Sequence, residues 1–122
     1  MVPHDAKWRK QHHVDRDLWR KAGDMGLLCL DLPAEYGCGG GDFRHEVVMY
    51  EELSRRAISG FGQGVHSMCA HYVYNYGTEE QKQRWLPRLA KGELIGAIAM
   101  TEPGAGSDLQ GIRTRAVREG DH

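Results

Sequence analysis

The chain has 122 residues, with 16 Lys and Arg against 17 Asp and Glu and a formal net charge of −1. This length suffices for one domain with its own core, and the balanced charge argues against a dedicated nucleic-acid binder, which normally carries a basic excess. No apolar run reaches the ~18 residues that a transmembrane helix needs, and 40% apolar residues argue against a disordered coil.

Two helices are predicted in the first half of the chain, separated by a glycine-rich loop. The first begins after Asp15, whose carboxylate suits an N-cap, and its apolar residues recur at i, i+4 and i+7. These residues are Leu18, Ala22 and Met25. Residues 27–32 then predict a short buried connector, and residues 33–41 predict a loop because no regular element tolerates so many glycines. Asp42 caps the second helix, which places four apolar residues on one face: Val47, Tyr50, Leu53 and Ala57.

The strongest helical signal lies between residues 65 and 76. Its apolar side chains recur at i, i+3, i+4, i+7, i+8 and i+11, which predicts a helix with one buried face. They are Val65, Met68, Cys69, Tyr72, Val73 and Tyr76. Gly77 ends this helix, and residues 78–81 (TEEQ) have the pattern of a capping box that opens a fourth helix. Pro87 predicts a kink in that helix because it removes an amide donor.

After Gly92 the pattern changes from helical to extended. Residues 94–100 form an apolar run too short for a core helix, which predicts a buried strand, and residues 112–117 alternate like a second strand. Two strands alone cannot bury a face. The sequence therefore predicts a helical domain over residues 1–92 and, over residues 93–122, the beginning of a β domain that is cut short.

The cysteines and histidines predict neither a disulfide scaffold nor a metal site. The three cysteines are odd in number and contain no C-x-x-C pair, which favours a reducing compartment: Cys29, Cys38 and Cys69. His66 and Cys69 share a helix face, but no further ligand joins them, so no metal site is expected. The first five residues hold neither an apolar signal core nor an Arg- and Ser-rich transit helix, so no targeting segment is expected.

The loop at residues 101–108 has the composition most typical of a ligand site. It places Thr101 and Ser107 around a Pro-Gly-Ala-Gly turn, directly after the apolar run. Glycines let backbone N–H groups approach a flat ligand closely, and the hydroxyls supply adaptable donors. Such a loop suits a ligand edge rich in carbonyl acceptors, or a phosphate, but a plain strand-end turn has the same composition. The glycine spacing matches neither a P-loop nor a dinucleotide fingerprint.

Several segments of the chain resemble the acyl-CoA dehydrogenase family. Residues 99–111 (AMTEPGAGSDLQG) are similar to the family signature, and residues 32–37 (LPAEYG) to its Pro-x-x-Tyr-Gly-Gly loop, with Cys38 where the second glycine is usual. Residues 76–82 and 85–87 also resemble the family. The likeness covers essentially the whole chain and is greatest to long-chain-type members. It implies a mainly α fold, in which the family's N-terminal helical bundle domain precedes the first strands of a truncated middle β domain.

The resemblance implies an FAD-dependent enzyme that oxidises acyl-CoA to trans-2-enoyl-CoA in fatty-acid β-oxidation. In that family a glutamate removes the α-proton, the β-hydrogen leaves as hydride to flavin N5, and the electrons pass to an electron-transferring flavoprotein. The glutamate lies in the family's C-terminal domain, so no catalytic residue is expected in this chain. The resemblance also implies a homotetramer, in the mitochondrial matrix of a eukaryote or the cytoplasm of a bacterium.

Carried over by position, the FAD-contacting segment runs from Ile98 to Ser107. Thr101 would donate its hydroxyl to the pyrimidine edge of the flavin, with backbone contacts from Met100 beside it. Gly106 and Ser107 would reach the flavin and its diphosphate side, and Ser107 would also contact the thioester arm of the acyl-CoA. Family members often carry an aromatic residue at position 98. The residues expected at the cofactor are Ile98, Ala99, Met100, Thr101, Gly106 and Ser107.

Two other functions fit the same sequence. An acyl-CoA oxidase or flavin monooxygenase of the same fold would use oxygen, and a non-catalytic helical interaction module would have kept the sequence but lost the chemistry. In either enzymatic reading the isolated chain is expected to be inactive and to retain FAD weakly or not at all, because the base and half of the flavin pocket are missing.

Overall fold

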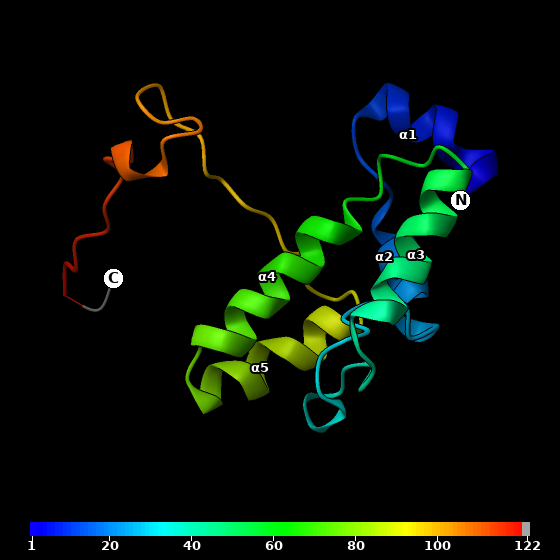
Figure 1. Ribbon diagram of the computed structural model, residues 1–122, viewed down its shortest axis with the longest axis horizontal. Helices are drawn as coiled ribbons and strands as arrows, with labels where there is room; N and C mark the ends of the chain where they lie inside the picture. The colour runs from blue at the N-terminus through cyan, green and yellow to red at the C-terminus, as the bar shows by residue number, and fades with distance from the viewer. Residues whose placement is uncertain (121–122) are drawn as a thin grey trace.

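The computed structural model describes residues 1–120, which form a helical body and a long C-terminal arm (Figure 1). The α-helices of this part of the chain are α1 (Asp5–Gln11), α2 (Arg16–Asp24), α3 (Phe43–Arg55), α4 (Gln63–Tyr76) and α5 (Glu79–Ala90), and its 3-10 helices are η1 (Val2–His4), η2 (Ala34–Tyr36) and η3 (Leu109–Gly111). The predicted mainly α fold is confirmed. Asp121 and His122, the last residues of the predicted 93–122 segment, lie outside the described residues.

Two helix starts are fixed by reciprocal capping: the box predicted at residues 78–81 forms, and the predicted cap Asp42 forms one as well. The Asp42 carboxylate accepts the N–H of Arg44 at 3.0 Å, while Nδ1 of His45 accepts the N–H of Asp42 at 3.0 Å. At α5, the Thr78 hydroxyl accepts the N–H of Gln81 at 3.3 Å, and Oε1 of Gln81 accepts the N–H of Thr78 at 2.8 Å. These bonds satisfy amides that a helix start otherwise leaves unpaired.

The core consists of two packed clusters. The first joins α1 and α2 to the chain before α4: Trp8, Val14, Trp19, Ala22, Leu28, Ile58 and Phe61. The second joins the predicted 27–32 connector and η2 to α4 and α5: Cys29, Leu32, Tyr36, Ala70, Leu86, Leu89 and Ala90. At the end of α5, a Cβ on Gly23 of α2 would lie 2.3 Å from the carbonyl carbon of Lys91. Only glycine therefore allows α2 to cross the end of α5 so closely.

The predicted apolar face is wrong for α4. Four residues of that stripe are exposed, by 43%, 49%, 57% and 81% of their surface: Val65, Met68, Tyr72 and Tyr76. The buried face carries mostly polar residues instead: Gln63, His66, Ser67 and Ala70. The α4 helix packs this polar face inward because its side chains find hydrogen-bond partners there.

Smaller corrections concern α1, α2 and α3. The short helix α1 was not predicted, because its seven residues bury only Trp8 and show no period. Met25 lies past the end of α2 and is exposed. In α3 the fully buried side chain is Glu46, whereas Val47 is exposed and Ala57 lies beyond the helix end.

The two predicted strands do not form among residues 1–120. Residues 95–100 and 112–117 have no strand partner in this part of the chain, and an isolated antiparallel bridge joins Glu102 and Ala105. A strand needs a neighbour for its N–H and C=O groups. These segments therefore form an arm that leaves the helical body past α4 and ends far from the N-terminus (Figure 1). None of the helices in residues 1–120 is long and apolar enough to span a membrane.

Candidate functional site

The arm is fastened to the helical body at Gly96. Its N–H donates to Nδ1 of His66 at 3.1 Å, and Nε2 of the same ring donates to the carbonyl of Leu89 at 3.1 Å. These bonds assign a neutral Nε2–H tautomer to His66, whose pKa burial lowers. A Cβ at position 96 would lie 2.6 Å from the Cβ of Cys69, so only a glycine at this position allows the arm to pass α4 so closely. His66 thus joins α4, α5 and the arm.

Beyond this point the arm and α4 border an open apolar groove of about 480 Å³. Its lining comes from α4 and from the arm: Cys69, Tyr72, Ala97, Ile98, Met100, Leu109 and Ile112. A volume of this size lies within the ~300–1,000 Å³ typical of small-molecule sites. Two of the predicted cofactor residues, Ile98 and Met100, therefore line the groove. Ala99 lies between them and is exposed.

The loop at the end of the groove has an internally fixed shape. Glu102 and Ala105 exchange two backbone hydrogen bonds, at 3.1 and 2.9 Å. The Glu102 carboxylate accepts the Thr114 hydroxyl at 2.6 Å and also the N–H of Arg113. These two bonds, the Thr114 hydroxyl first, hold the pKa of Glu102 below its usual range. Farther along, Oδ1 of Asp108 accepts the N–H of Gln110 at 3.1 Å.

The predicted contact groups of this loop are free to bind a ligand. The side chains of Thr101 and Ser107 are exposed, and their hydroxyls make no hydrogen bond to another residue of the 1–120 range. The N–H groups of Gly106 and Ser107 make none within that range either. A Cβ on Gly104 or Gly106 would meet nothing within 4 Å, so the backbone is open to close approach.

Free donors beside an apolar groove fit a flat ligand with carbonyl acceptors along one edge. A flavin has this form, because its ring is broad and apolar on its faces and carries carbonyl groups on its pyrimidine edge. The donor set of the loop, hydroxyl and backbone N–H groups, matches that edge. The donor groups and the apolar lining are thus of the kind that a flavin requires.

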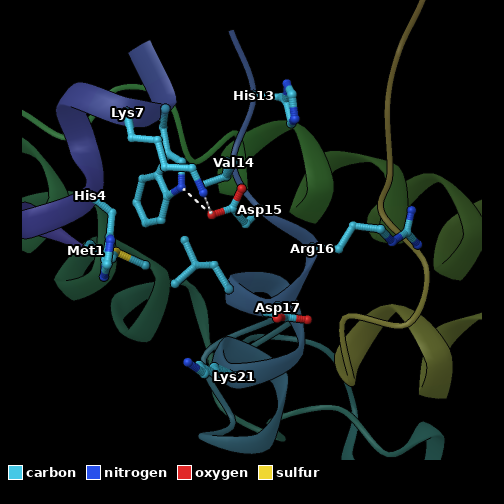
Figure 2. A pocket seen from close by; sticks show the side chains of 11 residues that line it. Met1, His4, Lys7, His13, Val14, Asp15, Arg16, Asp17 and Lys21 are labelled. Atoms are coloured by element: carbon cyan, nitrogen blue, oxygen red, sulfur yellow. Dashed lines mark hydrogen bonds and ion pairs between the residues drawn. The ribbon is translucent and has the colours of Figure 1, made fainter. Parts of the chain in front are cut away.

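A larger cavity, of about 670 Å³, lies between α1 and α2 (Figure 2), and Arg16 on its wall donates to the carbonyl of Glu93, just before the arm, at 3.1 Å. Oδ2 of Asp15 accepts Nζ of Lys7 at 2.7 Å and Nε1 of Trp8 at 3.2 Å across this space. These bonds, with one from Gln11, hold the pKa of Asp15 below its usual range; the bond from Lys7 contributes most. They also occupy its carboxylate, which explains why it makes no capping bond to α2. The cavity contains none of the predicted site residues, and we assign it no function.

Comparison with known proteins identifies the family. Residues 1–93 match the family model described as the N-terminal domain of acyl-CoA dehydrogenase. The chain belongs to the acyl-CoA dehydrogenase family. The pig mitochondrial long-chain specific acyl-CoA dehydrogenase is 46% identical over 98% of this chain, and the aligned part is 28% of that protein. The 122-residue chain thus spans less than a third of the length of that relative.

Solved structures of the family agree with the fold. An acyl-CoA dehydrogenase from Geobacillus kaustophilus superposes with a TM-score of 0.90 at 49% identity, over 98% of this chain and 32% of the other. A glutaryl-CoA dehydrogenase from Mycobacterium smegmatis, solved in complex with FADH2, gives a TM-score of 0.87 at 36% identity, over 98% and 31% of the two chains. The predicted family and its helical N-terminal domain are confirmed.

Sequence reasoning missed the anchor that positions the site. The sequence pattern raised His66 only as a metal ligand, and it did not single out the glycine at position 96. That glycine was the available signal, because a glycine inside an extended segment often marks close approach of another backbone or ligand. The hydrogen bond between the two residues could not be read from a pattern, since 30 positions separate them.

Proposed function

We propose that this chain forms the N-terminal part of an FAD-dependent acyl-CoA dehydrogenase that oxidises acyl-CoA to trans-2-enoyl-CoA. The observation that carries the proposal is the apolar groove ending at a loop of free donors, within the stretch that resembles the family signature. The proposed boundary between a helical domain (1–92) and a following domain (93–122) is supported by the end of the family match at residue 93.

The flavin, when bound, supplies the acceptor for the hydride that leaves the acyl β-carbon. The residues of this chain bind and orient it. Thr101 would donate its hydroxyl to the pyrimidine edge, beside the backbone of Met100, where fixed donors stabilise negative charge. Ile98 and Met100, which line the groove, would form an apolar wall that excludes water from this side of the ring, and Ala99 between them would contact the cofactor through its backbone.

The far end of the loop would serve the phosphates and the substrate. Gly106 and Ser107 have free N–H groups, which suit the diphosphate side of FAD. The hydroxyl of Ser107 would also contact the thioester arm of acyl-CoA. Removal of the α-proton is assigned to a glutamate that this chain does not contain. We also propose that the whole protein passes its electrons to an electron-transferring flavoprotein and that it forms a homotetramer. Its location would be the mitochondrial matrix of a eukaryote or the cytoplasm of a bacterium.

A chimeric enzyme tests this function. Residues 1–122 would replace the matching segment of the Geobacillus kaustophilus acyl-CoA dehydrogenase, whose fold they share. We expect the purified chimera to contain FAD and to reduce a dye acceptor when acyl-CoA is added. The 122-residue chain alone, mixed with FAD, acyl-CoA and the dye, should give no turnover.

Two results would contradict the proposal. One is a chimera that is folded by circular dichroism yet binds no flavin, and the other is turnover by the isolated chain. Hydrogen peroxide in place of dye reduction would point to the oxidase of the same fold. The parent G. kaustophilus enzyme, assayed in parallel, is the control for FAD content and for acceptor choice.

A further inference from the structure

Two cysteines lie on adjoining segments at the edge of the second core cluster. Three backbone hydrogen bonds fasten the loop after η2 onto the connector: Gly39 N–H to the Cys29 carbonyl at 3.0 Å, Gly40 N–H to Leu32 at 2.8 Å and Gly41 N–H to Leu30 at 2.9 Å. The residue after Cys38 therefore bonds to Cys29 itself. Cys38 packs against the cluster that contains Cys29, and each thiol shifts the pKa of the other.

We propose that Cys29 and Cys38 are a redox pair that closes reversibly into a disulfide when the chain meets an oxidised low-molecular-weight disulfide of the glutathione class. A disulfide requires the two Cβ atoms to approach within ~3.5–4.5 Å with their side chains facing each other. The loop and the connector that carry the two cysteines are already held together by backbone hydrogen bonds, so the thiols need little movement to reach this arrangement. This modification is independent of the proposed function.

The two cysteines have different surroundings, which sets the order of the reaction. Cys38 is partly exposed, whereas Cys29 is fully buried. The neighbouring Cys29 thiol lowers the pKa of Cys38, whereas the neighbouring Cys38 thiol and burial raise the pKa of Cys29. The accessible thiol with the lower pKa is therefore the attacking group, and the buried thiol resolves the intermediate.

The reaction balances in two exchanges. The Cys38 thiolate attacks one sulfur of the small disulfide, so that a mixed disulfide forms and one small thiolate leaves, which takes up the proton that Cys38 had lost. Cys29 then gives up its proton and attacks Sγ of Cys38, which breaks the mixed disulfide and releases the second small thiol, now protonated. Two protein thiols are oxidised to one disulfide, and one small disulfide is reduced to two thiols.

His66 does not act as the base in the second exchange. Its Nε2 lies 3.9 Å from Sγ of Cys29, but Nε2 carries the proton donated to Leu89, and Nδ1 already accepts the N–H of Gly96. The Cys29 proton therefore leaves through solvent or through the departing small thiolate. The third cysteine, Cys69, is partly exposed on α4 beside the groove and provides an internal control.

Redox titration with peptide mapping tests the pair. The 122-residue chain is equilibrated with oxidised and reduced glutathione at a series of ratios, alkylated, digested and analysed by mass spectrometry. We expect one intramolecular disulfide, Cys29–Cys38, reversed by dithiothreitol and unchanged in Cys69→Ser. In Cys29→Ser, Cys38 should instead retain glutathione. In concentrated urea the preference should disappear, and pairings with Cys69 should form as well.

Three results would overturn the proposal. The first is a folded chain in which Cys38 takes up glutathione while Cys29 stays reduced. The second is the same mixture of pairings with and without urea. The third is glutathionylation of Cys29 in Cys38→Ser at the rate seen for Cys38 in Cys29→Ser, because that would remove the proposed order of attack. Circular dichroism of each variant confirms that the comparison is between folded chains.

Discussion

Replacement of Gly96 by alanine tests the anchor that holds the arm against α4. The new Cβ would lie 2.6 Å from Cβ and 3.0 Å from Sγ of Cys69, and 3.3 Å from Cα of His66. Two of these atoms are the Cβ and Cα of a packed helix and cannot swing aside. The arm must therefore move, and the 3.1 Å bond from the Gly96 N–H to His66 is lost.

The size of the effect is limited by how easily the arm can leave. Overpacking of a closed core costs about 1–3 kcal/mol, and an orphaned buried acceptor a further ~1–3 kcal/mol. The groove beside Gly96 is open, however, so the arm can lift away and water can reach Nδ1 of His66. The net loss of stability is then close to that of one hydrogen bond, about 0.5–1.5 kcal/mol. The small apolar surface that the arm exposes as it lifts adds a little to this loss. We expect the free energy of unfolding to fall by about 1–2 kcal/mol.

Urea unfolding followed by circular dichroism measures this loss, and amide hydrogen exchange at position 96 reports the bond itself. Gly104→Ala is the matched control, because its Cβ would meet nothing within 4 Å and should change the stability very little. Cys69→Ala should not rescue Gly96→Ala, since the closest clash is with the Cβ that alanine keeps. Equal stability of the two glycine variants, or an amide at position 96 as protected as in the parent chain, would refute the reasoning.

Two further predictions concern buried and acidic groups. Glu46→Ala should lower the free energy of unfolding by about 2–4 kcal/mol in urea titrations, because the Leu30 N–H and the Gln63 amide both lose their acceptor; Glu46→Gln should cost less, and equal losses would contradict this. The pKa of Glu102 is lowered in the folded chain, so its stabilisation of the loop is present above the ordinary glutamate pKa and is lost as the pH falls through the lowered value. Thr114→Val should raise that pKa in an NMR titration, and an unchanged value would show that the hydroxyl is not its main cause.

The sequence predicted those features of the fold, such as helix starts, that depend on residues close together in the chain. Asp42 and Thr78 begin helices because their own side chains cap amides two or three residues away. The buried face of α4 was not predictable in this way. Its period indicated two faces, but which one turns inward depends on distant partners, namely Leu89 for His66 and Glu46 for Gln63.

In the candidate site, too, local sequence predicted some features, whereas others depended on distant partners. The loop at residues 101–108 stood out in the sequence because its glycines and hydroxyls lie next to one another and resemble a family signature. The prediction of strands on either side of the loop was wrong, because a strand forms only when a second strand pairs with its backbone. Residues 95–100 and 112–117 have no such partner among residues 1–120. The groove beneath Ile98 and Met100 likewise required the path of the arm over α4 to be known.

The affinity of the chimera for FAD tests the central claim, that the loop of this chain holds the flavin. Thr101→Ala combined with Ser107→Ala removes two free hydroxyl donors from an exposed loop without disturbing its internal bonds. At about 0.5–1.5 kcal/mol for each hydrogen bond, the dissociation constant measured by flavin fluorescence should rise roughly 5- to 150-fold. Ser59→Ala removes an exposed hydroxyl that does not line the groove, and should leave the dissociation constant unchanged. An FAD affinity that is the same in the double variant, in Ser59→Ala and in the parent chimera would contradict the account.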